Sequence, residues 1–272
     1  MAGTPLWLIR IIKRLFPHRF RLAELTRVPL LGRLIHVLGF ENDLVYYVPR
    51  SEVVQINRPF GAVENLACPS RVVEHFIERA RHLWIMNFCI CRDSNSCRDY
   101  PVELGCLFLG EAVLNINPKL GRLVDRETAR NHIRACRDAG LVHLIGRNKL
   151  DSLWLGARPA EKLMTICNCC PCCCLWRMLP HLSGRINEGV KRMPGVTLTV
   201  TERCIGCGTC AEGICFVDAI RIQNGRARIS SACRGCGQCV EVCPQKAIEL
   251  TLPDKADIEA AITRIEPRVN LS

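Results

Sequence analysis

The 272-residue sequence has few aromatic side chains and lacks the motifs of several common protein classes. Phe, Trp and Tyr make up only 6% of the chain. No G-x-G-x-x-G follows a predicted strand and no G-x4-G-K-[ST] occurs, so no nucleotide site is indicated. No C-x-x-C-H occurs either, which excludes covalently attached haem. A nucleotide-dependent enzyme or a cytochrome c is therefore not expected.

The N-terminus also lacks the features of a secretory signal. It shows no charged region ahead of an uninterrupted apolar stretch and no small-residue cleavage site. A second apolar run, Val28 to Phe40, is interrupted by Arg33 and His36, and it is shorter than the roughly 20 residues that span a bilayer. We expect a cytoplasmic protein that can lie against the inner face of the membrane.

Positive charge is concentrated at the N-terminus. The net charge is +11, and residues 1–36 hold seven Lys or Arg against one acid, Glu24. Trp7, Ile11 and Leu15 recur every four residues opposite basic side chains, which predicts an amphipathic helix ending at Pro17. Such a helix would lie on an anionic membrane, or pack on this protein's own core or on a partner subunit. We expect deletion of residues 1–36 to leave the metal content intact.

Cysteine is abundant, with 20 residues in 272, and in a reducing compartment this favours metal or redox chemistry over disulfides. The strongest pattern is a pair of strings, the second matching C-x2-C-x2-C-x3-C-P. The strings contain Cys204, Cys207, Cys210 and Cys215, then Cys233, Cys236, Cys239 and Cys243. They resemble a bacterial-type ferredoxin with two [4Fe–4S] clusters rather than paired zinc sites.

In that family the fourth cysteine of each string ligates the other cluster. The resemblance thus implies one cluster held by Cys204, Cys207, Cys210 and Cys243, and a second held by Cys233, Cys236, Cys239 and Cys215. Two departures occur: one extra residue precedes Cys215, and Phe216 stands where the family has proline. The flanks predict two strand–string–strand repeats joined by a hairpin at Asn224-Gly225.

A second group of ten cysteines lies in the middle of the chain. They are Cys89, Cys91, Cys97 and Cys106, followed by Cys167, Cys169, Cys170, Cys172, Cys173 and Cys174 in "CNCCPCCC". Adjacent residues of an extended chain point to opposite sides, so we expect the run to lie between two metal centres or along one larger centre. One or two further Fe–S clusters would result. The two cysteines beyond the eight that two cubes need would be spare, ligate an unusual cluster, or serve as redox thiols.

Local patterns place these cysteines in their surroundings. Apolar spacing predicts a helix over residues 70–86, a second helix opening near Pro101, and a helix-then-strand unit over residues 122–146 that ends its helix at Gly140. Arg92 is expected either to donate hydrogen bonds to cluster sulfurs or to be exposed. The isolated Cys68 and Cys136 are interpreted as buried small residues, and His132 and His143 show no ligand spacing. Zinc alone and a metallothionein-like store remain alternatives for the ten cysteines.

Taken together, the central pattern and the C-terminal strings resemble multi-cluster ferredoxin-like iron–sulfur proteins over roughly residues 60–250. This resemblance implies single-electron transfer, in anaerobic metabolism, to or from a partner oxidoreductase. The alternative is a reductase or catalytic accessory subunit whose central cluster is open to substrate. A nucleic-acid partner is not expected, because residues 125–138 pair four Arg with three acids and form no basic stripe.

The expected fold class is α+β, with a cysteine-rich mixed α/β domain followed by a ferredoxin-like module. We predict a basic arm at 1–40, the cysteine-rich domain at 41–180, the two-cluster module at 195–252, and a C-terminal helix and tail at 253–272. The segment "SGRINEGVKRMPG" is predicted to be a linker between the two domains.

Overall fold

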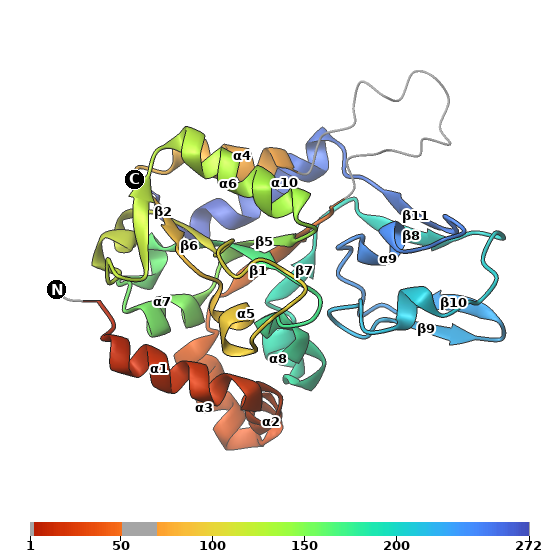
Figure 1. The fold of residues 1–272 in the computed structure, drawn as a ribbon, viewed down its shortest axis with the longest axis horizontal. Helices are drawn as coiled ribbons and strands as arrows, with labels where there is room; N and C mark the ends of the chain where they lie inside the picture. Colours follow the sequence, from red (N-terminus) through yellow and green to blue (C-terminus); the bar gives the residue numbers. More distant parts are fainter. Residues whose placement is uncertain (1–2, 51–69, 272) are drawn as a thin grey trace.

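A computed structural model describes residues 3–50 and 70–271 as helices packed on both faces of one large sheet, with a smaller module beside it (Figure 1). The seven-stranded sheet has the order β4-β2-β3-β6-β5-β1-β7. Its strands are β1 (Leu44–Val48), β2 (Leu83–Met86), β3 (Leu107–Leu109), β4 (Gly121–Val124), β5 (Val142–Arg147), β6 (Met164–Cys169) and β7 (Val190–Arg192). All neighbours are antiparallel except β1 and β7.

Three helices cover one face of this sheet: α4 (Ser70–Arg79), α6 (Arg126–Asp138) and α10 (Lys255–Ile265). Their apolar stripes pack in one core with alternate strand residues such as Tyr46 and Ile166. Because successive strand side chains alternate between faces, Tyr47, Cys167 and Cys169 lie on the opposite face. The cysteines of β6 therefore point away from the three-helix layer.

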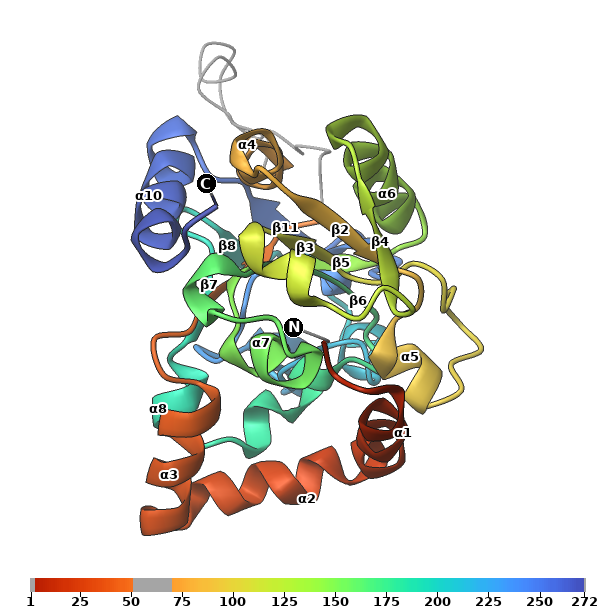
Figure 2. The same cartoon turned by 90° about the vertical axis from the view of Figure 1, so that its left-hand side faces the viewer.

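The opposite face is covered by the N-terminal helices and by short central helices (Figure 2). These are α1 (Leu6–Leu15), α2 (Arg19–Glu24), α3 (Pro29–Gly39), α5 (Ile90–Ser94), α7 (Lys149–Leu155) and α8 (Gly184–Asn187). Helix α1 buries Ile9 against the core of Trp84 and Phe108. The arm thus packs on this protein's own core, one of the alternatives left open by its sequence.

Two helix predictions need correction. The helix predicted over residues 70–86 ends at Arg79, and Leu83–Met86 form β2 instead. No helix opens near Pro101, and Leu107–Leu109 form β3. Both strands are buried on both faces, so their side chains are apolar without alternation, and periodicity cannot separate such a strand from a helix.

The predicted linker is also part of the fold. Its residues form α8 and then β7, which pairs in parallel with β1 at the edge of the sheet. The C-terminal helix forms as predicted, and it returns to the main sheet with Ile258, Ala261, Ile262 and Ile265 buried beside α4. The main domain therefore draws on both ends of the chain.

The C-terminal module contains two small sheets and one short helix. Strand β8 (Thr197–Val200) pairs with β11 (Ile248–Thr251), and β9 (Ile220–Gln223) pairs with β10 (Arg226–Ile229). Helix α9 (Gln238–Glu241) lies within the second cysteine string and contains Cys239. The predicted hairpin at Asn224-Gly225 joins β9 to β10, and both residues have the positive φ that a two-residue hairpin turn of this type requires.

Candidate metal centres

The fold divides the ten central cysteines into two sets. Four of them, the four-cysteine set, form a compact group: Cys97, Cys170, Cys172 and Cys173. The other six line one cavity, the six-cysteine cavity, which Cys170 of the four-cysteine set also borders: Cys89, Cys91, Cys106, Cys167, Cys169 and Cys174. Every predicted central ligand belongs to one of these two sets.

The division follows from the local backbone. Alternation along β6 places Cys167 and Cys169 on the same face, where both line the cavity. The strand ends at Cys169, and the turn that follows carries Cys170 to Cys173 to the other set. Cys174 then returns to the cavity. Cys170 belongs to the four-cysteine set and also lines the cavity, so it lies at the boundary between the two sites.

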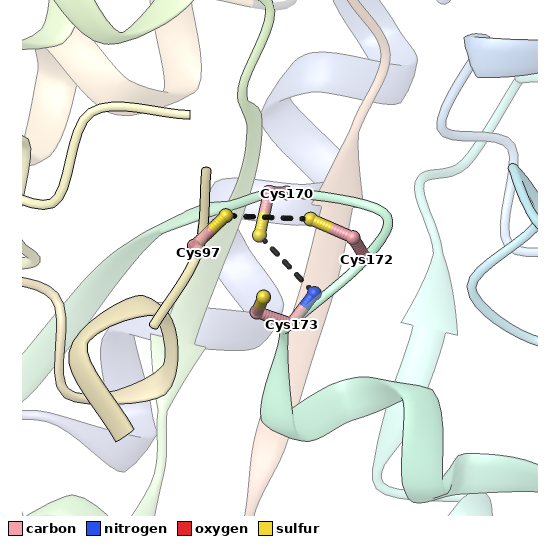
Figure 3. Close-up of side chains that lie close together, drawn as sticks. All are labelled: Cys97, Cys170, Cys172 and Cys173. Carbon is pink, nitrogen blue, oxygen red and sulfur yellow. Dashed lines mark hydrogen bonds between the residues drawn. The ribbon is translucent and has the colours of Figure 1, made fainter. Parts of the chain in front are cut away.

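In the four-cysteine set the thiols point toward one another from two loops (Figure 3). Their four sulfurs all lie within 4.8 Å of one another, and Cys97 Sγ is 3.6 Å from Cys172 Sγ. The backbone N–H of Cys173 donates to Cys170 Sγ at 3.3 Å. Cys170 and Cys173 are buried, whereas Cys172 is exposed. A soft, tetrahedral donor set of this kind suits a transition-metal ion.

The six-cysteine cavity is wider, with a volume of about 230 Å³. Cys106, Cys167, Cys169 and Cys174 are neighbours in a row, and Cys89 and Cys91 form a separate neighbouring pair. The sulfurs are thus distributed around the cavity, which leaves room for a group of several atoms among them.

Arg92 lies between the two sets and is fully buried. Its guanidinium donates to the carbonyl oxygen of Asn168 at 2.9 Å and to that of Leu104. Burial lowers the pKa of Arg92, but the nearby Cys89 and Cys170 raise it more, so the side chain is charged. In turn, the hydrogen bond from Cys172 and the positive charge of Arg92 lower the pKa of the Cys170 thiol to about 5. Arg92 therefore favours thiolates in both sets.

The C-terminal module brings its eight cysteines to two further cavities. Cys204, Cys207, Cys210 and Cys243 line the first, and Cys215, Cys233, Cys236 and Cys239 line the second. The fourth cysteine of each string thus lies beside the three leading cysteines of the other string. Backbone N–H groups donate at 3.3 Å to the sulfurs of Cys204, Cys215 and Cys243. Such bonds stabilise thiolate ligands.

Tyr47 and Phe216 connect the second module cavity to the main domain. Phe216, at the position where the resembled family has proline, packs edge-on against the Tyr47 ring with centroids 5.7 Å apart. Both side chains lie in one apolar cluster with Cys169, Cys174 and Cys236. Burial raises the pKa of Tyr47 well above its usual value, and the nearby Cys174, Cys169 and Cys236 raise it further. Tyr47 therefore lies between the module and the six-cysteine cavity.

Three of the four isolated residues lie in the described part of the chain, and Cys136 is buried as predicted. Cys136 packs in one cluster with Cys170 and Cys173 without belonging to the four-cysteine set, and the Nε2–H of His132 donates to the Gly105 carbonyl oxygen at 2.9 Å. His143 is buried against Asn168 at 2.8 Å, and burial lowers its pKa to about 4. Cys68 lies outside the described residues.

Sequence reasoning missed Asp151 and Tyr47. Asp151 lines the six-cysteine cavity and accepts hydrogen bonds from Asn148, Trp154 and Thr165. Burial raises its pKa to about 7, and the nearby Cys167 adds to the shift. An isolated acid or tyrosine carries no spacing signal, so only the packing of distant segments shows their role.

The comparisons with known proteins agree with the C-terminal strings. The family described as a 4Fe-4S dicluster domain matches residues 196–255. The searches of curated proteins and of solved structures return no significant match. Within the described residues, no helix combines the length and apolarity needed to cross a bilayer. The chain is an iron–sulfur protein of mixed α/β fold with a 4Fe–4S dicluster domain at residues 196–255.

Proposed function

We propose that this protein transfers single electrons between a partner oxidoreductase and an iron–sulfur centre in the six-cysteine cavity. The eight cysteines of the module would hold two [4Fe–4S] clusters, one in each of its cavities. The observation that carries the proposal is the position of Tyr47, which has Cys236 of the module and Cys169 and Cys174 of the central cavity as neighbours. The contact of cysteines from both sites with one side chain supports a continuous electron route.

The route is expected to run through the second module site. Its cysteines line a cavity together with Tyr47, whereas the first site is lined by module residues alone. Cys207 of the first site is exposed, which suits exchange with an external partner. We therefore infer that electrons pass from the partner to the first module cluster, then to the second module cluster, and then to the central centre. The same order would serve electron flow in the reverse direction.

Matched cysteine variants test this order. Cys236→Ser is expected to slow reduction of the central centre strongly when electrons are supplied by a protein donor, because the cluster nearest to Tyr47 is altered. Cys207→Ser alters the first module cluster. It should slow the entry of electrons from the donor while leaving the contact of the second module site with Tyr47 intact. Freeze-quenched EPR under anaerobic conditions follows each centre separately. Equal central reduction rates in wild type and Cys236→Ser would contradict the route.

Crossed ligation is a separate prediction for the module. Cys243→Ser is expected to change the EPR signal of the cluster held by Cys204, Cys207 and Cys210, because Cys243 lies beside those residues. Cys215→Ser should change the signal of the other cluster. If Cys243→Ser instead alters the cluster of its own string, ligation is not crossed.

A substrate-open central centre is the second candidate function. Six thiols exceed the four that a cube requires. The cavity also places Ile12, Phe16 and Trp154 beside the thiols, so an apolar molecule could approach the centre. A change in the central EPR signal on adding a small ligand such as cyanide would favour this function over electron transfer alone.

We also propose that the N-terminal arm binds the surface of an anionic membrane. The arm buries one face on the core and leaves eleven large apolar side chains exposed: Trp7, Ile11, Leu15, Leu22, Leu25, Val28, Leu30, Leu31, Leu34, Val37 and Leu38. Five exposed arginines lie among them: Arg10, Arg14, Arg21, Arg27 and Arg33. Exposed apolar side chains flanked by cations match the acyl chains and the anionic headgroups of a membrane surface.

Vesicle sedimentation tests this interface. Leu30→Gln with Leu34→Gln is expected to weaken binding to phosphatidylglycerol-containing vesicles by roughly a hundredfold, or about 3 kcal/mol, because two leucines no longer enter the bilayer. The control, Leu123→Gln with Ile205→Gln, removes exposed apolar side chains from elsewhere on the surface. Binding should also weaken as salt rises. Equal loss in both double variants, or equal binding to neutral vesicles, would contradict an anionic membrane as the partner.

A further inference from the structure

The four-cysteine set differs from the other cysteine sites in how close its sulfurs lie. Among the described residues, it is the one group of three or more His, Cys, Asp or Glu ligand atoms that all lie within 4.8 Å of one another. Its Cys97–Cys172 sulfur distance is 3.6 Å. In a tetrahedral site with metal–sulfur bonds of about 2.3 Å, neighbouring sulfurs are about 3.8 Å apart.

The module provides an internal comparison. Its two sets of four cysteines carry the signature of [4Fe–4S] ligands, and each set surrounds a cavity rather than forming a compact group. In a cube the four thiolates bind four different irons, so iron and sulfide atoms separate them. The six-cysteine cavity likewise surrounds an open space with its thiols, and at about 230 Å³ it is far larger than the module cavities of about 10 and 20 Å³. The four-cysteine set does not surround such a space.

We infer that Cys97, Cys170, Cys172 and Cys173 bind a single tetrahedral metal ion, zinc or iron, and no cube. This assignment goes beyond the proposed electron route, which uses the module and the six-cysteine cavity. It also accounts for the cysteine count of the central region: four thiols serve one ion, and six remain for one larger centre.

The ion has a structural consequence for the neighbouring centre. Cys169 and Cys174 line the cavity. In the chain, Cys169 directly precedes Cys170, and Cys174 directly follows Cys173, so each is the neighbour of a residue of the four-cysteine set. Cys97 comes from a loop 73 positions earlier in the chain than Cys170. A metal ion that ties this loop to the turn fixes both ends of the turn, and so holds two cavity thiols in place.

Metal and sulfide analysis of the anaerobically purified full chain tests the inference. The variant Cys97→Ser with Cys172→Ser is expected to lose about one metal ion per chain and no acid-labile sulfide. A cube at this site would instead cost about four irons and four sulfides. Elemental analysis distinguishes zinc from iron, and either ion without sulfide supports the assignment. The matched control, Cys136→Ser, changes a buried thiol that packs beside Cys170 and Cys173 but is not one of the four proposed ligands, so it should keep the metal ion.

X-ray absorption of the wild-type protein keeps the test decisive if the double variant does not fold. A zinc ion in this site should show four sulfur neighbours at about 2.3 Å and no neighbouring metal. If the bound ion is iron, the test is substitution with cobalt, which should give the visible spectrum of tetrahedral cobalt thiolate. Wild-type protein that contains iron and labile sulfide in equal amounts, with no zinc, would overturn the inference. The EPR signals of the module report separately on the proposed electron route.

Discussion

Replacing Arg92 with leucine is expected to remove most of the metal from the central region while the module remains loaded. Arg92 is fully buried and lies beside thiols of both central sets. Without it, buried thiolates lose their positive neighbour and the carbonyl oxygens of Asn168 and Leu104 lose their donor. Removing one partner from a buried charged pair typically costs about 3–5 kcal/mol. Metal analysis and chemical unfolding under anaerobic conditions measure both effects.

Two variants serve as controls for this prediction. Arg98→Leu removes an exposed arginine close by and should change neither metal content nor stability. Arg92→Lys retains the charge but cannot reproduce the planar fork that serves two carbonyls, so an intermediate loss is expected. If Arg92→Leu retains the full central metal content, the proposed stabilisation of thiolates by Arg92 is wrong.

Shortening the side chains on the inner face of the N-terminal arm is expected to expose the central centre to oxygen. Ile12 and Phe16 line the six-cysteine cavity, and Arg19, which stacks on Phe16, ties the arm to the central region by donating to Asn95 Oδ1 at 3.4 Å. Ile12→Ala with Phe16→Ala should lower the free energy of unfolding by about 5 kcal/mol or more. We also expect the visible absorbance of the central centre to bleach several times faster in air, because water and oxygen gain access.

The outer face of the same helix provides the matched control. Trp7→Gln with Ile11→Gln alters exposed side chains and should weaken membrane binding without changing the rate of bleaching. The structure also changes one expectation from the sequence: deletion of residues 1–36 removes part of the cavity wall, so the central metal content should fall. Bleaching at the wild-type rate in the Ile12–Phe16 variant would show that the arm does not shield the centre.

Several features of the fold were predictable because their signals are local. The hairpin at Asn224-Gly225, the helix after Asp125 and the C-terminal helix each combine a cap or turn residue with apolar periodicity, and all three form. Strands β2 and β3 were predicted as helix because they are buried on both faces of the sheet. Their sequences contain no alternation, and only the neighbouring strands decide their conformation.

The sequence by itself predicted thiolate chemistry for this protein, because cysteine type and spacing indicate such ligands before the fold is known. It also determined that the C-terminal strings match a 4Fe–4S dicluster domain, since those ligands lie within one short segment. Tertiary structure alone decided how the ten central cysteines divide, because Cys97 joins the turn after β6 and Cys89, Cys91 and Cys106 join the cavity across the sheet. It also placed Tyr47, Arg92 and the arm around these sets, since contacts between residues far apart in the chain depend on packing and leave no trace in local spacing.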